Sequence, residues 1–343
     1  MNHPTNRPIT IATRGSALAL AQTHLILKMC QGAFPTLHFD YKIIKTTGDK
    51  LQTASMSKTD PDLPKGLFTK ELEVALLKGH ADLAVHSLKD LPTELPAGLI
   101  LAATPARADV RDVLIYRDGA GFISQRNKAT VSKDWTPGQD ALSGLTPHLD
   151  LNDFPMGATI ATSSTRRAAQ LRLARPDLNI VEIRGNVTTR MTRVAERGKI
   201  DATVLALAGI SRLNFTINPD GGLTGDGVPA GLLATIVDVK TMLPCVGQGA
   251  IGVEIRAGDE RIAIICESLN HVNTFQAVTA ERAFLQGMGG GCQSPVAAYA
   301  EIRGNKITMQ AVSFKDGPAR HAEGERMVKE AAELGAQLAA ELR

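Results

Sequence analysis

The sequence has few cysteines, few aromatic residues and little net charge. Its four cysteines (Cys30, Cys245, Cys266 and Cys292) include no CxxC pair, and its eight histidines show no paired ligand spacing. This spacing indicates neither a zinc site nor a dense disulfide framework, so we expect no metal and a reducing compartment. Aromatic residues make up 4% of the chain and the formal net charge is +3. Both values argue against a protein that binds single-stranded nucleic acid by stacking bases on aromatic rings.

Long apolar segments are also missing. No part of the sequence approaches the roughly 20 apolar residues that a membrane-spanning helix requires. The segment 1–8 is short and polar and lacks the apolar stretch of a signal peptide. The first strand-like segment already begins at about Ile9. With 343 residues, 43% of them hydrophobic, the chain is expected to form two or three domains of a soluble globular enzyme.

Strand-like and helix-like segments alternate through much of the chain. In the N-terminal third, the expected strands are 9–13, 38–45 and 81–86, and the expected helices are 16–29 and 68–78. Further along, the expected strands are 159–163, 179–183 and 202–206, and the expected helices are 164–174 and 187–197. This alternation predicts βαβ units with a mainly parallel sheet.

Other segments break the alternation. Residues 118–155 are rich in Gly, Pro, Asp, Ser and Thr, and we interpret them as a crossing between domains with a surface insertion. Residues 218–231 form a second Gly-rich loop. Beyond about residue 256, a helical stretch at 261–286, three short strands and a helix from about Arg326 predict a small α+β domain.

Three basic segments lie where an expected strand meets an expected helix: 13–16, 162–167 and 184–190. Backbone N–H groups at a helix start, with a cap such as Ser16, form a natural anion site, and arginine suits carboxylates held in a fixed geometry. Because ligands of open α/β sheets bind at the carboxyl ends of the strands, we expect a polyanionic ligand there. For each segment alone, an ordinary helix cap or a solvated arginine-rich face is the alternative interpretation.

Two further segments carry candidate chemistry. In 85–92 (VHSLKDLP), Lys89 and Asp90 lie where a buried strand emerges. An aspartate there can stabilise a developing cation or transfer a proton, and a simple turn aspartate is the alternative. In 287–295 (GMGGGCQSP), Cys292 follows a run of glycines, which accept backbone angles closed to other residues. Because such a loop adds little to a core, we interpret Cys292 as a covalent attachment point.

Seven segments resemble, in this order, motifs of the porphobilinogen deaminase (hydroxymethylbilane synthase) family: 11–16 (IATRGS), 66–72 (GLFTKEL), 84–90 (AVHSLKD), 162–167 (TSSTRR), 184–187 (RGNV), 246–250 (VGQGA) and 291–295 (GCQSP). They extend over essentially the whole chain. The resemblance implies two α/β domains, shaped like periplasmic binding proteins, that flank a cleft, and a small C-terminal α+β domain. The implied domain limits are 1–116 with 244–267, 117–243, and 268–343.

The resemblance also implies a reaction of tetrapyrrole (haem) biosynthesis. A transferase joins four porphobilinogen molecules head to tail, releases four ammonia molecules and frees the linear tetrapyrrole hydroxymethylbilane. The primer would be a dipyrromethane cofactor bound to Cys292 by a thioether. Each pyrrole carries an acetate and a propionate, which would explain the crowded arginines. Loss of ammonia leaves an azafulvene cation, and Asp90 would be the catalytic residue that stabilises it.

Site residues follow from the same resemblance. The cofactor would be held by Cys292, Lys89, Asp90, Ser164, Arg166, Arg167 and Arg190. The substrate and the growing chain would face Arg14, Ser16, Gln22, Arg184, Arg190, Arg212, Phe68 and Lys58. Core packing is an equal alternative for Phe68, and Lys58 lies in a proline-rich segment, 55–65, that is a candidate mobile cover.

Two other functions fit parts of the sequence. A non-catalytic anion-binding protein would share the fold, but the missing signal peptide and the Cys292 loop, which a receptor does not need, argue against it. A nucleic-acid binder would use the arginine clusters, but the low net charge and the few aromatic residues argue against it. We therefore expect a cytoplasmic, monomeric enzyme with porphobilinogen as its small-molecule partner and with neither nucleic acid nor a membrane as a partner.

Overall fold

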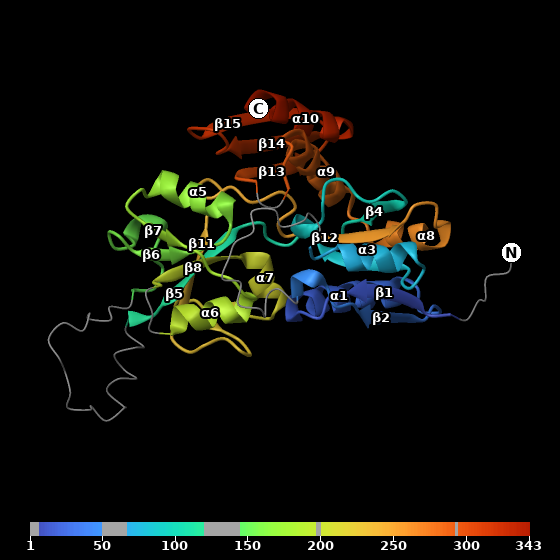
Figure 1. Cartoon of the computed structure of the whole chain (residues 1–343), viewed down its shortest axis with the longest axis horizontal. Coiled ribbons are helices and arrows are strands. Elements are labelled where there is room, and N and C mark those ends of the chain that lie inside the picture. Colours follow the sequence, from blue (N-terminus) through green and yellow to red (C-terminus); the bar gives the residue numbers. More distant parts are fainter. Residues whose placement is uncertain (1–6, 50–66, 120–144, 197–199, 292–293) are drawn as a thin grey trace. The chain divides into compact units, whose positions relative to one another are not determined.

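The computed structural model of the chain describes residues 7–49, 67–119, 145–196, 200–291 and 294–343. The chain divides into two compact units, which we call unit 1 (Met1–Val110 with Leu243–Arg343) and unit 2 (Arg111–Met242). Figure 1 labels most of the helices and strands of both units. Unit 1 is therefore built from two separate stretches of chain, with the whole of unit 2 inserted between them.

Unit 1 contains an α/β part built on a sheet whose described strands are β1 (Ile9–Thr13), β2 (Phe39–Ile43), β3 (Leu83–Ser87), β4 (Leu99–Ala103) and β12 (Ile251–Arg256). The order is β2-β1-β3-β12-β4. Strand β1 runs parallel to β2 and β3, whereas β12 is antiparallel to β3 and β4. Helices α1 (Ala17–Ala33) and α8 (Glu260–Leu269) pack on one face, and α3 (Lys70–Leu77) packs on the other.

Apolar side chains on both faces of the strands explain this layering. In β1, Ile9 and Ile11 belong to the core shared with α1 and α8, while Ala12, the next residue, faces the core under α3. Successive side chains of a strand point to opposite faces, so a strand with buried apolar residues on both faces must be covered on both sides. The sheet is therefore a central layer, and its functional groups can emerge only at its edges and ends.

Unit 2 repeats this arrangement. Its sheet in the described residues consists of β5 (Asp112–Arg117), β6 (Thr159–Ala161), β7 (Asn179–Val181), β8 (Ala202–Ala206) and β11 (Leu232–Val237), in the order β11-β5-β8-β6-β7. Helix α5 (Thr165–Ala174) covers one face, and α6 (Val187–Ala195) with α7 (Leu207–Arg212) covers the other. A 3₁₀ turn, η2 (Leu151–Asp153), and a hairpin of β9 (Thr216–Ile217) and β10 (Leu223–Thr224) complete the unit.

Each sheet has four described strands that run in one direction and one antiparallel strand, so the expected mainly parallel sheet is confirmed, but the antiparallel strand was not predicted. In unit 2, β6 is parallel to β7 and β8, but β5 is antiparallel to both β8 and β11. In each unit, the antiparallel strand (β5 or β12) is the first strand after the chain enters or re-enters that unit. Local alternation of strands and helices does not reveal such a strand, because its partners lie far away in the sequence.

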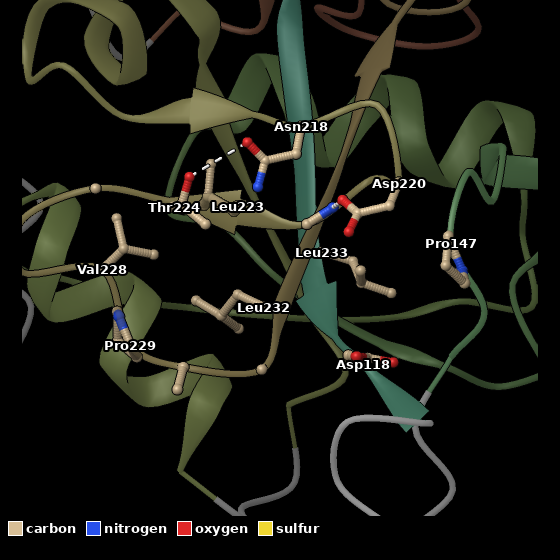
Figure 2. Close-up of a pocket in the computed structure, with 14 residues that line it drawn as sticks. Asp118, Pro147, Asn218, Asp220, Leu223, Thr224, Val228, Pro229, Leu232 and Leu233 are labelled. Carbon is tan, nitrogen blue, oxygen red and sulfur yellow. Dashed lines mark hydrogen bonds between the residues drawn. The ribbon is translucent and has the colours of Figure 1, made fainter. Parts of the chain in front are cut away.

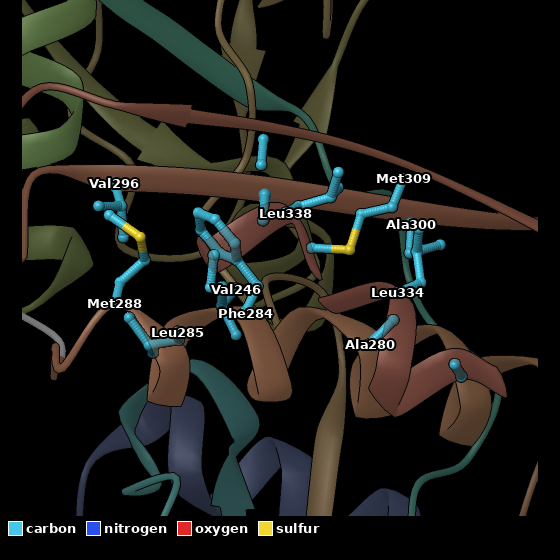
Figure 3. Packing of buried hydrophobic residues seen from close by; sticks show 14 of the residues in the cluster. Val246, Ala280, Phe284, Leu285, Met288, Val296, Ala300, Met309, Leu334 and Leu338 are labelled. Carbon is cyan, nitrogen blue, oxygen red and sulfur yellow. The ribbon is translucent and has the colours of Figure 1, made fainter. Parts of the chain in front are cut away.

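The C-terminal part of unit 1 is a small α+β structure. Strands β13 (Val296–Arg303), β14 (Lys306–Ser313) and β15 (Arg320–Met327) form an antiparallel meander. Helices α9 (Val272–Gly287) and α10 (Ala331–Leu342) pack against it, and Figure 3 shows Phe284, Leu338 and Met309 in the core between strands and helices. Burial of a side chain such as Phe284 contributes roughly 1.5–3 kcal/mol, so this part has a substantial core of its own.

Two predictions for the helices of this region were wrong in detail. The expected helical stretch 261–286 is two helices, α8 and α9, because Asn270 ends the first and the His271 side chain caps the second. The expected helix from Arg326 begins only at Ala331, because β15 continues its pairing with β14 through Met327. The α/β fold class with an additional small α+β part is confirmed, whereas the three-domain limits remain a prediction.

Candidate functional site

The Lys89–Asp90 turn is the first part of the candidate site. Strand β3 is followed at once by the 3₁₀ turn η1 (Leu88–Asp90). Leu88 and Leu91 are buried, whereas Lys89 and Asp90 are only partly buried. The two leucines anchor the turn and leave its charged side chains at the surface. Within the described part of the chain, the Asp90 carboxylate makes no hydrogen bond or ion pair.

Arg14, at the carboxyl end of β1, contacts residues from two other segments. Its Nε donates to Asp49 Oδ1 at 3.2 Å, and its guanidinium carbon lies 4.3 Å from the centroid of the Phe68 ring. Burial alone would raise the pKa of Asp49, but hydrogen bonds from Arg14 and Thr46 hold that pKa below its ordinary value. Asp49 is therefore ionised at neutral pH and compensates the charge of Arg14. The sequence did not single out Asp49.

Ser16 and Gln22 have supporting positions beside the same strand ends. The Ser16 hydroxyl accepts a hydrogen bond from the backbone N–H of Ala19 at 3.3 Å and caps α1, as its position in the motif indicated. Gln22 is 2% exposed, and its Nε2 donates to the Ser87 hydroxyl at 2.9 Å. Gln22 thus joins α1 to the end of β3. A direct contact with substrate would require this buried amide to change its partners.

Arg166 and Arg167, at the start of α5, converge on one carboxylate. The Ser164 hydroxyl caps the helix by accepting from Arg167 N. Arg166 Nη2 donates to Asp112 Oδ2 at 2.8 Å, and Arg167 Nη2 donates to Asp112 Oδ1 at 2.7 Å. The two arginine side chains are 4% and 7% exposed, and that of Asp112 is fully buried. These arginines, expected to meet a ligand, lie largely inside unit 2.

The two arginines also set the electrostatics of Asp112. Burial alone would raise the pKa of Asp112, but the two adjacent guanidinium groups outweigh it and hold that pKa well below its ordinary range. Both guanidinium groups thus bind the same buried carboxylate. Arg167 Nε is also buried and has no hydrogen-bond partner in the described structure. The Nε–H of Arg167 is therefore a buried donor that suits an anionic group. The sequence did not identify Asp112.

The remaining arginines of unit 2 differ in exposure. The Arg184 side chain is 50% exposed and lies 3.7 Å from a Glu182 carboxylate oxygen. Arg190, on α6, donates from Nε to the Gly185 carbonyl at 2.8 Å. Burial lowers the pKa of Arg212 to about 10, so this side chain is still a cation at neutral pH. Arg184 is thus the group most accessible to a ligand in this set.

The sheet order explains which predicted residues gather. Strands β7, β6 and β8 are adjacent, with β6 parallel to both neighbours, and the parallel ends of β6 and β7 are followed by Ser164 and Arg184. In unit 1, the parallel strands β1 and β3 are followed by Arg14 and the Lys89–Asp90 turn. In each unit, these residues therefore follow the carboxyl ends of adjacent parallel strands, the place where an α/β fold binds its ligand.

Two predicted residues, Cys292 and Lys58, lie outside the described residues, but both flanks of Cys292 are anchored. On one side, Lys315 Nζ donates to the carbonyl of Met288 at 2.7 Å. On the other side, the backbone N–H of Phe314 donates to the carbonyl of Pro295 at 2.9 Å. Both donors follow β14 directly. The end of one strand thus holds the chain on either side of the cysteine, a role the sequence did not suggest for Lys315.

An open cavity of about 530 Å³ in unit 2 is a separate feature (Figure 2). It lies beside the β9–β10 hairpin and the start of β11, and its charged lining residues are Asp118 and Asp220. No lysine or arginine of the described residues lines it. Because carboxylates repel a polycarboxylate, this cavity does not suit the ligand that the arginines favour.

Residues 7–49, 67–119, 145–196, 200–291 and 294–343 contain neither a metal-binding cluster nor a membrane-spanning helix. No group of three or more His, Cys, Asp or Glu side chains in these ranges is arranged to hold a metal ion. Among the helices that the structure describes, none combines the length and apolar character needed to span a bilayer.

Comparison with known proteins gives the chain a family. The family model "Porphobilinogen deaminase, dipyromethane cofactor binding domain" matches residues 9–264, and "Porphobilinogen deaminase, C-terminal domain" matches residues 275–343. A porphobilinogen deaminase of Syntrophus aciditrophicus is 41% identical over 97% of this chain and 94% of its own length. One from Sorangium cellulosum is 39% identical over 98% of both chains.

Similar solved structures are more distant. The periplasmic aliphatic sulphonate binding protein SsuA of Escherichia coli is 11% identical, with a TM-score of 0.36 over 84% of this chain and 71% of its own. The Bacillus subtilis protein ytmK, a probable amino-acid ABC transporter extracellular-binding protein, is 11% identical, with a TM-score of 0.37 over 77% and 90%. These scores are too low to support a conclusion. The family matches, in contrast, cover nearly the whole sequence, and the chain belongs to the porphobilinogen deaminase family of transferases, which polymerise porphobilinogen in tetrapyrrole biosynthesis and have a domain that binds a dipyrromethane cofactor.

Proposed function

We propose that Asp90 is the catalytic residue for each condensation. Loss of ammonia from porphobilinogen leaves a cationic methylene pyrrole, and an ionised carboxylate beside it lowers the energy of that cation. The observation that carries the proposal is the Asp90 carboxylate itself, which is partly exposed on an anchored turn and has no partner among the described residues. A carboxylate already committed to an ion pair, such as Asp112, would be far less available.

The proposed cofactor site uses Lys89, Asp90, Ser164, Arg166, Arg167 and Arg190, with Cys292 as the point of attachment. The fit to dipyrromethane is supported by the two buried guanidinium groups at the start of α5 and by the Nε of Arg167, which has no hydrogen-bond partner among the described residues. When bound, the dipyrromethane supplies the pyrrole carbon at which chain growth begins. The protein's part is to bind the carboxylates and to hold the thiol-bearing loop at its two anchored flanks.

Porphobilinogen and the growing chain would contact a second set of residues: Arg14, Ser16, Gln22, Lys58, Phe68, Arg184, Arg190 and Arg212. Charge complementarity supports this set, because each added pyrrole brings two carboxylates. The Arg184 side chain is 50% exposed, which supports a direct contact with a substrate carboxylate. The ring contact between Arg14 and Phe68 supports stacked contacts with the pyrrole rings. Ser16 and Gln22 would act mainly by holding the strand ends, since their side chains already bond within the protein.

The test is an Asp90→Asn variant, which keeps the size of the side chain and removes its charge. We expect a folded protein whose intact mass includes the dipyrromethane, with kcat reduced by about 100-fold or more, the range for loss of a preorganised electrostatic contact. Glu94→Gln, a change of the same kind four residues away on an exposed side chain, is the matched control and should keep normal kcat. Substantial turnover by Asp90→Asn would remove Asp90 from the mechanism.

We further propose that the enzyme is a cytoplasmic monomer with no nucleic-acid or membrane partner. The spacing of the four cysteines supports the cytoplasmic location, the net charge of +3 argues against a nucleic-acid partner, and the family resemblance supports the monomer. Light scattering during size-exclusion chromatography measures the oligomeric state directly, and a mass near twice 36.5 kDa would contradict it.

A further inference from the structure

Glu281 is a fully buried carboxylate outside the proposed site. It lies on α9, the helix that leads towards Cys292, and accepts four hydrogen bonds. Arg107 donates from Nη1 to Oε1 at 2.6 Å and from Nη2 to Oε2 at 3.0 Å. The backbone N–H of Gly247 donates to Oε2 at 2.8 Å, and that of Ala300 donates to Oε1 at 3.1 Å. Three separate segments of unit 1 thus meet at this carboxylate.

The Gly247 turn packs directly against the Asp90 turn. Gly247 has a φ of +72°, and a Cβ placed there would lie 3.2 Å from Lys89 N and from the Leu88 side chain. The backbone N–H of Leu88 donates to the carbonyl of Ala250 at 3.1 Å, and Ala250 N donates to the carbonyl of Gly247 at 3.2 Å. A left-handed backbone and close packing both require glycine at this position. A displacement of the Gly247 turn would therefore move the Leu88–Asp90 turn with it.

Arg107 holds the other side of the same turn. Its Nε donates to the Gln248 carbonyl at 2.7 Å. The backbone of Gly249 is equally constrained, because its φ is +83° and an added Cβ would lie 2.5 Å from the Ala108 carbonyl oxygen. Residues 107–108 and 247–249 therefore form one closely packed element, and Glu281 supplies the charge that holds it to α9.

Electrostatics keeps this arrangement rigid. Burial alone would lower the pKa of Arg107, but the Glu281 carboxylate outweighs it and raises that pKa above its ordinary value. A buried ion pair with further hydrogen bonds tolerates little displacement, since loss of one partner leaves an uncompensated buried charge. The sequence motif 246–250 has no role in the proposed chemistry. Its residues Gly247 and Gln248 are hydrogen-bonded to Glu281 and Arg107, so the motif is part of this charged network.

We propose that Glu281 is a positioning residue for the Asp90 turn: it fixes the Gly247 turn to helix α9 and thereby sets the Asp90 carboxylate relative to the domain that bears Cys292. The proposal rests on the proposed roles of Asp90 and Cys292. Glu281 contacts neither substrate nor cofactor in this scheme. It acts through the backbone N–H of Gly247, which its carboxylate orients, and through Leu88, which packs on that turn.

The experiment uses the full-length enzyme carrying its cofactor. Glu281→Gln keeps the shape of the side chain. It places one neutral oxygen and one amide N–H₂ where the two carboxylate oxygens accept from Arg107. We expect the intact mass to show bound dipyrromethane, kcat to fall by about 100-fold, as for a displacement of about 1 Å in an active site, and KM to change by less than about threefold. A purely structural role would lower the melting temperature without this split between kcat and KM.

Phe284→Leu is the matched control. It removes volume from α9 in the core of Figure 3, where Phe284 packs in one cluster with Val246, and it keeps the Glu281 carboxylate that accepts from Gly247 N. We expect it to lower the melting temperature while kcat, measured well below that temperature, stays normal. The proposal would be overturned if folded Glu281→Gln kept a normal kcat. It would also be overturned if Phe284→Leu lost as much kcat as Glu281→Gln.

A second variant covers the case in which Glu281→Gln does not fold. Arg107→Lys keeps a cation beside Glu281 but cannot also reach the Gln248 carbonyl, so we expect kcat to fall at least about tenfold with little change in KM; normal kcat would overturn the proposal. Asp90→Asn is assayed in parallel. Activity in Asp90→Asn would refute the proposed function itself, whereas an inactive Asp90→Asn with fully active Glu281 and Arg107 variants would refute only the positioning role.

Discussion

Replacing Asp112 by asparagine tests how the two buried arginines of unit 2 are held. The substitution is nearly isosteric, so it removes charge with little change in volume. It leaves Arg166 and Arg167 facing one neutral amide at positions where their side chains are 4% and 7% exposed. Breaking a buried ion pair by removing one partner costs about 3–5 kcal/mol. We expect Asp112→Asn to destabilise unit 2 by that amount.

The loss can be expressed as a melting temperature. Unit 2 has about 130 residues, and for a domain of that size each 1 kcal/mol lowers the melting temperature by roughly 3–4 °C. Asp112→Asn should therefore melt roughly 10–20 °C below the unchanged protein at pH 7. Thermal unfolding followed by circular dichroism measures this. Asp177→Asn in the same unit removes a more exposed carboxylate paired with Arg175, and it should change the melting temperature much less.

The pH dependence gives an independent check with a definite sign. The pKa of Asp112 is lower in the folded protein than its ordinary value of about 3.9. Its contribution to stability is therefore fully present above about pH 5 and is lost as the pH falls below about 4, towards the folded-state pKa. The difference in melting temperature between the two proteins should stay constant from about pH 5 to 8 and shrink in stronger acid. A shift of less than about 3 °C at pH 7, or a constant difference down to about pH 2.5, would refute the buried-pair explanation.

Further variants test the attachment, the exposed arginine and the tight turn. Cys292→Ser should lack the mass of dipyrromethane, and a normal pink Ehrlich reaction from the purified variant would contradict attachment there. Arg184→Gln should raise KM for porphobilinogen several-fold with an unchanged melting temperature, because its side chain is half exposed; unaltered KM would assign Arg184 to the solvated surface. Gly249→Ala should lower stability by about 1–3 kcal/mol, since its Cβ would meet the Ala108 carbonyl, and urea unfolding with an unchanged midpoint would contradict that contact.

The strand-to-helix junctions could be predicted because their signals are local. Ser164 and Asn186 cap α5 and α6 by accepting hydrogen bonds from backbone N–H groups three residues ahead. Such caps depend on adjacent residues and the turn they form. The positions of Ser16 and of the Lys89–Asp90 turn follow from the same kind of pattern, in which an apolar strand ends and polar residues begin.

The partners of the charged residues could not be predicted. Asp112 and the arginine that it binds through Oδ1 are 55 residues apart, and Arg107 and Glu281 are 174 apart. In the sequence, Asp112 is an acid at the start of an apolar strand and Glu281 is an acid within a helical segment. Neither position differs locally from an ordinary exposed carboxylate, so the burial that gives each its role is visible only once the chain has folded.

The amino-acid sequence by itself determined the alternating α/β elements, the caps at the strand ends, the Gly-rich cysteine loop and, through seven collinear motifs, the family. The tertiary structure decided the antiparallel strands β5 and β12, the burial of Arg166 and Arg167 against Asp112, and the joining of α9 to the Gly247 turn by Glu281. The physical reason is the separation along the sequence over which each interaction acts. Backbone propensity and capping act over a few residues, whereas strand pairing and the compensation of buried charge depend on which distant segments the fold brings together.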